Sequence, residues 1–173
     1  MTTRQGWQGR YYEDFAAGDV YEHPLGRTVT TTDNAWFTLL TQNTNPIHFD
    51  HHYAAQTRFG RPLVDSTFTL ALVTGQSVTD VSQHALANVG WDEVRLPAPV
   101  FEGDTIYSRS QVLELRESRS RPDVGIVTVA TSGYNQEGTT VITFRRTIMV
   151  YKRGHGPARP RPATADGDEG ERR

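Results

Sequence analysis

The sequence contains no cysteine, and this absence removes several kinds of chemistry at once. Disulfide bonds, thiol nucleophiles and cysteine-based metal sites are all excluded. A chain without disulfides is compatible with the reducing cytoplasm, which we take as the expected location.

Long apolar segments are missing as well. Residues 1–7 lack the apolar stretch of a signal peptide, and the longest apolar run, 68–73, is interrupted by Thr69 and is too short to span a bilayer. The formal net charge is only -2, which gives no electrostatic reason to expect a nucleic acid or an anionic membrane as partner. We therefore expect a cytoplasmic protein that binds neither.

The rest of the composition is that of one globular domain followed by an end of different character. The 173 residues suffice for one domain with a real core but not for two ordinary ones. Residues 153–173 are largely Gly, Pro, Arg, Asp and Glu without a large apolar side chain, so we expect a disordered tail there. The alternative is an Arg- and Pro-rich docking segment. We assign 1–10 to an N-terminal extension and 11–152 to the folded domain.

Two helices are predicted before residue 60. Thr32 and Asp33 are good N-cap residues, and the apolar side chains within 35–40 that follow them have helical spacing. Pro46 ends this pattern, because proline is not tolerated in a helix interior. A second, short helix is expected over about residues 50–59.

The most apolar segment of the chain, residues 67–75, is predicted to be a helix that begins after Asp65 and Ser66 and continues to Val78. Its apolar residues occupy more than one face, so such a helix must be wrapped by other structure. A buried strand is the competing interpretation of so short a run. The N-cap residue and the Ala and Leu content favour the helix.

The second half of the sequence has the features of antiparallel strands. The expected strands cover 93–96, 105–116, 125–133 and 139–152, and a β-branched run at 27–31 adds a short one. Residues 135–138 form a hairpin turn that ends in a glycine suited to positive φ. One buried helix followed by such strands predicts an α+β fold, with the sheet curling round the helix.

Three motifs in this order resemble the MaoC-like family of the hot-dog fold. Segment 43–48 reads Asn-Thr-Asn-Pro-Ile-His, in the frame of that family's Asp-x-Asn-Pro-x-His signature. Segments 99–105 and 133–138 are similar to its strand entry and its last hairpin. The resemblance covers residues 11–152, and segments 68–75 and 90–94 look most like the subgroup that includes itaconyl-CoA and mesaconyl-CoA hydratases.

The resemblance implies an α+β hot-dog fold with a long central helix and an enzyme that hydrates or dehydrates a short, branched or dicarboxylic acyl-CoA. It implies a homodimer, and it requires neither a metal nor a redox cofactor, because CoA is part of the substrate. Two other functions stay open: a non-catalytic subunit that binds acyl thioesters, and a hot-dog thioesterase.

One position of the signature departs from the family. Hydration needs a base for the attacking water, an acid for Cα and donors for the enolate oxygen. The family's Asp is replaced here by Asn43, and an amide can orient water but cannot act as a general base. His48 keeps its place as acid and base, since an unperturbed imidazole titrates at roughly 6.5. The resemblance leaves Asn45 to fix the loop.

A carboxylate from elsewhere is therefore expected to support His48. We favour Asp65 over Asp50, although an Asp before a helix is also an ordinary N-cap. The resemblance places the N–H groups of Ser66 and Thr67 at the thioester carbonyl. Arg61 is a candidate for a CoA phosphate or an acyl carboxylate, with surface solvation as the alternative.

A metal site is not expected, although His51 and His52 follow His48 closely. Adjacent residues on a helix point about 100° apart, and no cysteine or suitably spaced carboxylate completes a ligand set.

Overall fold

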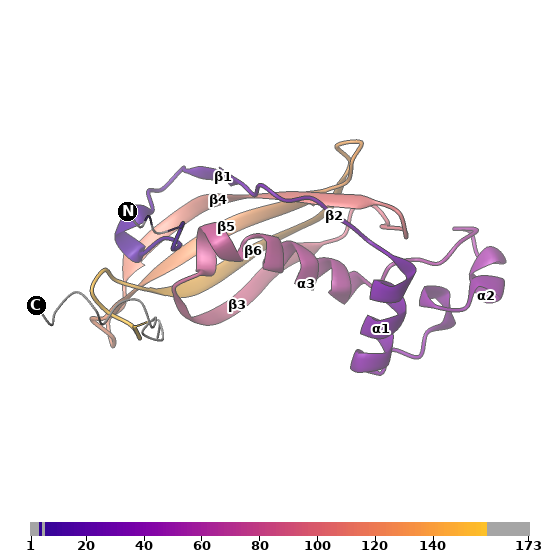
Figure 1. Cartoon of the computed structure of the whole chain (residues 1–173), viewed down its shortest axis with the longest axis horizontal. Helices are drawn as coiled ribbons and strands as arrows, with labels where there is room; N and C mark the ends of the chain where they lie inside the picture. Colours follow the sequence, from indigo (N-terminus) through magenta and orange to yellow (C-terminus); the bar gives the residue numbers. More distant parts are fainter. Residues whose placement is uncertain (1–3, 5, 159–173) are drawn as a thin grey trace, which may run out of the picture.

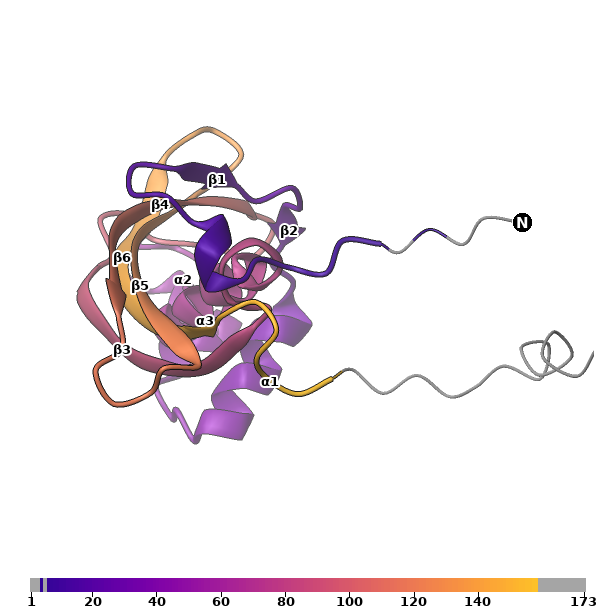
Figure 2. The ribbon, with the colours of Figure 1, turned by 90° about the vertical axis from the view of Figure 1, so that its left-hand side faces the viewer.

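The computed structural model describes residue 4 and residues 6–158 of the chain. A curved antiparallel sheet wraps around one helix, α3 (Figures 1 and 2). The sheet has the order β1-β4-β5-β6-β3, and β2 pairs with β4 beside it. The strands are β1 (Val20–Glu22), β2 (Arg27–Thr28), β3 (Ala85–Arg95), β4 (Thr105–Glu117), β5 (Val124–Tyr134) and β6 (Thr140–Tyr151).

The central helix α3 (Ser66–Gln76) begins at Ser66, next to the predicted start, and ends before the predicted Val78. Asp65 caps it by accepting hydrogen bonds from the N–H groups of Thr67 and Phe68. A π-helical turn, η3 (Val78–Ser82), follows at its C-terminal end. A Cβ on Gly133 would lie 2.7 Å from Val73 Cγ2, so the missing side chain of Gly133 is what lets α3 approach β5 closely.

The face of the sheet that covers α3 is apolar at both ends and polar in between. One apolar cluster includes Val73, Ile106 and Phe144, and the other includes Val81, Val112 and Ile148. Between them a polar band of buried side chains faces inward, made of Ser108, Ser110, Thr131 and Arg146. The alternation along β4 and β6 therefore continues through the band, with polar residues at inward positions.

Helix α1 (Thr31–Thr41) begins earlier than expected and buries a different face. Its N-cap is Thr30, and Asp33 is the third residue of a capping box, so the prediction of Thr32 or Asp33 as the cap was wrong. Asn34 and Thr38 are the buried residues. Three of the apolar side chains point outward: Trp36 is 65% exposed, and Leu39 and Leu40 are each 77% exposed.

The remaining short helices lie between α1 and α3. The 3-10 turn η2 (Pro46–His48) follows α1, and α2 (His51–Ala55) is capped by Asp50. Helix α2 is therefore shorter than the predicted 50–59. Both α1 and α2 extend beyond the end of the sheet, next to the N-terminal end of α3 (Figure 1).

The strand predictions differ from the structure mainly at their beginnings. β3 begins at Ala85, upstream of the predicted 93–96, and pairs with β6 through register shifts. The run 27–31 contributes only Arg27 and Thr28, because Thr30 already caps α1. β1 was not predicted at all.

Contacts of the domain extend beyond both predicted boundaries. Trp7 donates a hydrogen bond to the Thr79 carbonyl at 3.1 Å, although it lies in the predicted extension 1–10. Arg153 donates through its backbone N–H to Glu13 at 3.0 Å, although it opens the predicted tail. Most of that tail, residues 159–173, lies outside the described residues. Within the described part of the chain, no helix is long and apolar enough to cross a membrane.

Candidate active site

The loop between α1 and α2 is fixed by its own side chains. Gln42 ends α1 in the left-handed conformation, and the Asn43 N–H then bonds to the Thr38 carbonyl at 2.9 Å. Asn45 caps η2 by accepting from the Ile47 N–H at 3.2 Å, and Pro46 occupies the first position of that turn. Asn45 therefore fixes the start of the turn that contains His48.

His48 is held in one tautomer. Its side chain is nearly buried, and Nδ1 lies 2.7 Å from the Leu63 carbonyl oxygen. A carbonyl can only accept, so Nδ1 carries the hydrogen in the neutral ring. Nε2 is then the unprotonated nitrogen and can accept a proton from water, which is what a general base must do.

Asn43 and Asp65 form a direct pair at the start of α3. Asn43 Nδ2 donates to Asp65 Oδ2 at 2.6 Å, and Asn43 Oδ1 accepts from the Asn45 N–H at 3.1 Å. These two bonds orient the amide and leave one of its two N–H bonds for another acceptor. The replacement of the family's Asp by Asn43 is thus matched by a nearby carboxylate.

The Asp65 carboxylate accepts several hydrogen bonds from the first turn of α3. Its Oδ1 accepts from the Thr67 N–H at 2.7 Å, the Thr67 hydroxyl at 2.6 Å and the Phe68 N–H at 3.1 Å. Burial alone would raise its pKa, but the hydrogen bonds from Thr67, Asn43 and Phe68 outweigh burial and hold the pKa below its ordinary value. A carboxylate with a lowered pKa is a weak base, so Asp65 acts by holding other groups.

Neither candidate carboxylate bonds to His48 in the part of the chain that the structure describes. Asp50 accepts from the Tyr53 N–H at 2.9 Å and caps α2. The acceptor that orients His48 is the Leu63 carbonyl instead. The N-cap interpretation of Asp65 is confirmed.

Asn34 was missed by the sequence analysis, although it joins the parts of the site. It is fully buried on α1, and its Nδ2 donates to the His48 carbonyl at 2.6 Å and to the Leu63 carbonyl at 3.1 Å. Its Oδ1 accepts from the Asp65 N–H at 3.0 Å. The available signal was an amide four residues before Thr38, which puts the two polar side chains on the same face of the predicted helix.

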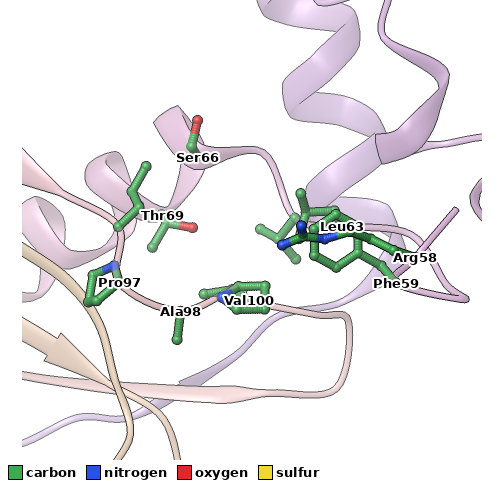
Figure 3. A pocket seen from close by; sticks show the side chains of 11 residues that line it. Arg58, Phe59, Leu63, Ser66, Thr69, Pro97, Ala98 and Val100 are labelled. Atoms are coloured by element: carbon green, nitrogen blue, oxygen red, sulfur yellow. The ribbon is translucent and has the colours of Figure 1, made fainter.

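A pocket of about 270 Å³ lies beside the N-terminal end of α3 (Figure 3). It is lined by Arg58, Phe59, Leu63, Val64, Ser66, Thr69, Leu96, Pro97, Ala98, Pro99 and Val100. The Thr67 N–H predicted for the thioester carbonyl is already used by Asp65. Ser66 lines the pocket at the first position of α3, where the helix dipole favours a negative oxygen.

Arg61 is placed outside this pocket lining. Its guanidinium lies over the Phe101 ring, 3.8 Å from the centroid. A second, apolar groove of about 560 Å³ runs along α1 to Asn43, between Leu39 and Phe49. Asn43 therefore stands between this groove and the start of α3.

Comparison with known proteins identifies a family and several relatives that this chain resembles. The profile of the family described as Mesaconyl-CoA hydratase matches residues 2–172. The chain is 34% identical to a Mesaconyl-CoA hydratase of Cereibacter sphaeroides, over 91% of this chain and 46% of that protein. It is 33% identical to a Beta-methylmalyl-CoA dehydratase of Chloroflexus aurantiacus, over 90% of this chain and 44% of that protein.

Solved structures with a similar fold are also found. A putative MaoC domain protein dehydratase from Chloroflexus aurantiacus superposes with a TM-score of 0.82 and 32% identity, over 94% of this chain and 45% of that one. A Mycobacterium tuberculosis protein described as having a double hotdog fold superposes with a TM-score of 0.78 and 23% identity, over 94% of this chain and 49% of that one. These matches confirm the predicted hot-dog fold. The chain spans less than half the length of the curated relatives it matches first.

Proposed function

Because the chain belongs to the family described as Mesaconyl-CoA hydratase, we propose that it adds water to, or removes water from, Cβ of a short acyl-CoA such as mesaconyl-CoA. The observation that carries this proposal is His48, whose Nδ1 is tied to the Leu63 carbonyl so that Nε2 can accept a proton. It stands in the signature segment, and the Leu63 to which it bonds lines the pocket at the start of α3.

The reaction follows from these positions. His48 Nε2 takes a proton from water as the water oxygen bonds to Cβ, and the protonated ring then delivers a proton to Cα. The remaining N–H of Asn43 orients the water. The negative charge that develops on the thioester oxygen is stabilised by the Ser66 N–H and the positive end of α3. Asp65 fixes the Asn43 amide and does not itself take the proton.

Of the other predicted site residues, Asn45 and Thr67 hold parts of the site in place and Arg61 is a candidate for binding the substrate. Asn45 keeps the signature loop in place, and Thr67 supports the Asp65 carboxylate through its hydroxyl and N–H. Arg61 remains a candidate for a CoA phosphate, since it is an exposed cation next to the pocket loop. The predicted cytoplasmic location stays a prediction.

We further propose that the chain forms a homodimer in which a second copy covers the outward face of α1. Trp36, Leu39 and Leu40 on that face are more exposed than side chains of their kind usually are. The Mesaconyl-CoA hydratase of Cereibacter sphaeroides and the dehydratase structure from Chloroflexus aurantiacus are about twice as long as their match to this chain, so a second copy would supply what their other half supplies.

The dimer is tested by sedimentation of the purified chain. Trp36→Ser combined with Leu39→Ser should yield monomers, whereas the control Leu113→Ser, at an exposed position on β4, should leave the dimer intact. Dimers that persist in the double variant would place the interface elsewhere.

A non-catalytic acyl-thioester-binding subunit is the second candidate. It is favoured by Asn43, which cannot act as a base, and by an Asp65 carboxylate whose Oδ1 is fully used in capping. In this case the pocket would bind the thioester and leave the chemistry to another chain.

Assays of the purified protein separate these functions. We expect loss of enoyl absorbance with mesaconyl-, itaconyl- or crotonyl-CoA and abolition of that activity in His48→Ala, with His52→Ala on exposed α2 as the matched control. Binding without turnover would establish the second candidate. Release of free thiol with the double bond retained would identify a thioesterase.

A further inference from the structure

The pocket at the start of α3 contains a single ionisable residue. Arg58 is the only charged side chain among its lining residues, and the neighbours along the wall are apolar or prolines, such as Leu63, Ala98 and Pro97. Figure 3 shows the Arg58 side chain extending from its loop toward the pocket, with the guanidinium nitrogens at its inner end. One cation in an apolar wall selects for an anion at one end of a ligand.

Arg58 is held in position by aromatic stacking. Its guanidinium lies over the Phe59 ring, 5.0 Å from the centroid, and Phe59 meets Phe101 edge to face at 6.2 Å. The loop is tied to the opposite wall by the bridge between Leu63 and Phe101. A guanidinium that is already placed loses less conformational freedom on binding than a mobile one.

No carboxylate of the described residues forms an ion pair with Arg58. Its five N–H donors are therefore open to a ligand, and a planar fork matches a carboxylate in a bidentate manner. Arg61 differs in this respect, because it stacks on Phe101 and does not line the pocket.

We propose that Arg58 binds a second carboxylate on the acyl group and so makes the site selective for dicarboxylic acyl-CoA thioesters. This rests on the proposed function, which puts the thioester carbonyl at Ser66. The acyl chain then lies across the apolar wall of Ala98 and Val100, and its far end reaches Arg58. Filling the pocket also removes water from this contact, which strengthens the attraction between the two charges.

The test compares two enoyl thioesters that differ in the second carboxylate, mesaconyl-CoA and crotonyl-CoA. Arg58→Gln should lower kcat/KM for mesaconyl-CoA by about tenfold to a hundredfold, the range of a lost charged hydrogen bond, and leave crotonyl-CoA within about twofold. Arg58→Lys should recover part of the loss, since it keeps the charge without the fork. Arg119→Gln, in the exposed loop between β4 and β5, is the matched control.

Calorimetric binding of the same two thioesters keeps this inference separate from the proposed function. If the wild type binds both but hydrates neither, the proposed function fails, and a loss of mesaconyl-CoA affinity alone in Arg58→Gln still supports Arg58. Equal losses for both thioesters, or no loss for either, would overturn the role of Arg58 while hydration stands. A wild type that binds neither thioester overturns both.

Discussion

A buried histidine lies near each end of α3, and the two histidines differ in how many of their ring nitrogens bond to protein groups. At the N-terminal end, His48 uses Nδ1 on the Leu63 carbonyl and has no described protein partner for Nε2. At the C-terminal end, buried His23 uses both nitrogens, with Nδ1 3.0 Å from Asp80 and Nε2 2.9 Å from Ser110. A histidine whose two nitrogens bond only to buried protein groups has no route to a substrate, whereas a histidine with one unoccupied nitrogen can exchange a proton with a bound molecule.

The difference extends to the surrounding groups. Asp80 is shared between His23 and Arg10, so the second network fastens the N-terminal segment to η3. Ser110 continues this network to Thr131 at 2.9 Å, inside the sheet. The first network has Asn34 at its centre and ends at a pocket. A chain of Asp, His and Ser is therefore not by itself a catalytic site, because its serine must also be reachable, and Ser110 is fully buried.

The largest contrast is expected from removing each histidine. His48→Gln should lower kcat on the best thioester by about 10²–10⁴-fold, the usual contribution of a general acid-base residue, with little change in unfolding free energy. His23→Gln should do the reverse and cost about 1–3 kcal/mol of stability, because Asp80 and Ser110 lose their partner. Chemical denaturation and steady-state assays on both variants check this. Loss of activity in stable His23→Gln would end the distinction.

The next effect concerns Asn34, which holds the active end together. Asn34→Leu leaves the His48 and Leu63 carbonyls and the Asp65 N–H without their described partner. We expect a loss of about 3 kcal/mol or more in unfolding free energy, since each buried unpaired group costs about 1–3 kcal/mol. A lower kcat at an unchanged KM is expected as well. Asn34→Asp is the matched variant, because it keeps the shape and the acceptor for the Asp65 N–H but replaces the donors by a buried carboxyl oxygen facing two carbonyls, so we expect it to be no less destabilising.

The sequence predicted the elements of this fold better than their contacts. Alternation identified strands β4 to β6 to within a few residues, and Asp65 marked the start of α3, because these signals are local. Periodicity grouped the apolar residues of α1 but did not show that Trp36, Leu39 and Leu40 point outward. Which side of a helix points outward depends on the elements that pack against it, and these lie elsewhere in the chain or in another chain.

The site was predicted in part for the same reason. Segment 43–48 named Asn43 and His48, but the group that orients His48 is a backbone carbonyl, and every residue has one. Asn34 reaches that carbonyl from 29 residues away, so its role depends on folding. Nothing in the sequence singled out Arg58, whereas Arg61 was named as a candidate, and only the structure puts Arg58 and not Arg61 in the pocket wall.

A smaller effect is expected from the charge of Asp65. Asn is also a good N-cap, so Asp65→Asn keeps the cap and removes the charge. It should cost about 1 kcal/mol at pH 7. Because the folded pKa of Asp65 is lowered, its stabilisation is present above the unfolded value and is lost as the pH falls through the folded value. Denaturation from pH 7 to pH 3 should show wild type and variant converging; a constant difference would deny the charge any role.

The smallest effect is expected at the C-terminal end of α3, where none of the described residues provides a counter-ion for the buried Arg146. Its Nη1 donates to Ser77 at 3.2 Å, but Nε and Nη2 have no described partner, and burial lowers its pKa to about 10. Burying such a charge is costly, so Arg146→Met should leave stability within about 1 kcal/mol or raise it. Thermal unfolding and kcat together decide the case. If the Arg146→Met variant is stable and fully active, the C-terminal end of α3 has only a structural role. A stable variant with a reduced kcat would mean that the polar band influences the reaction and that both ends of α3 contribute to activity.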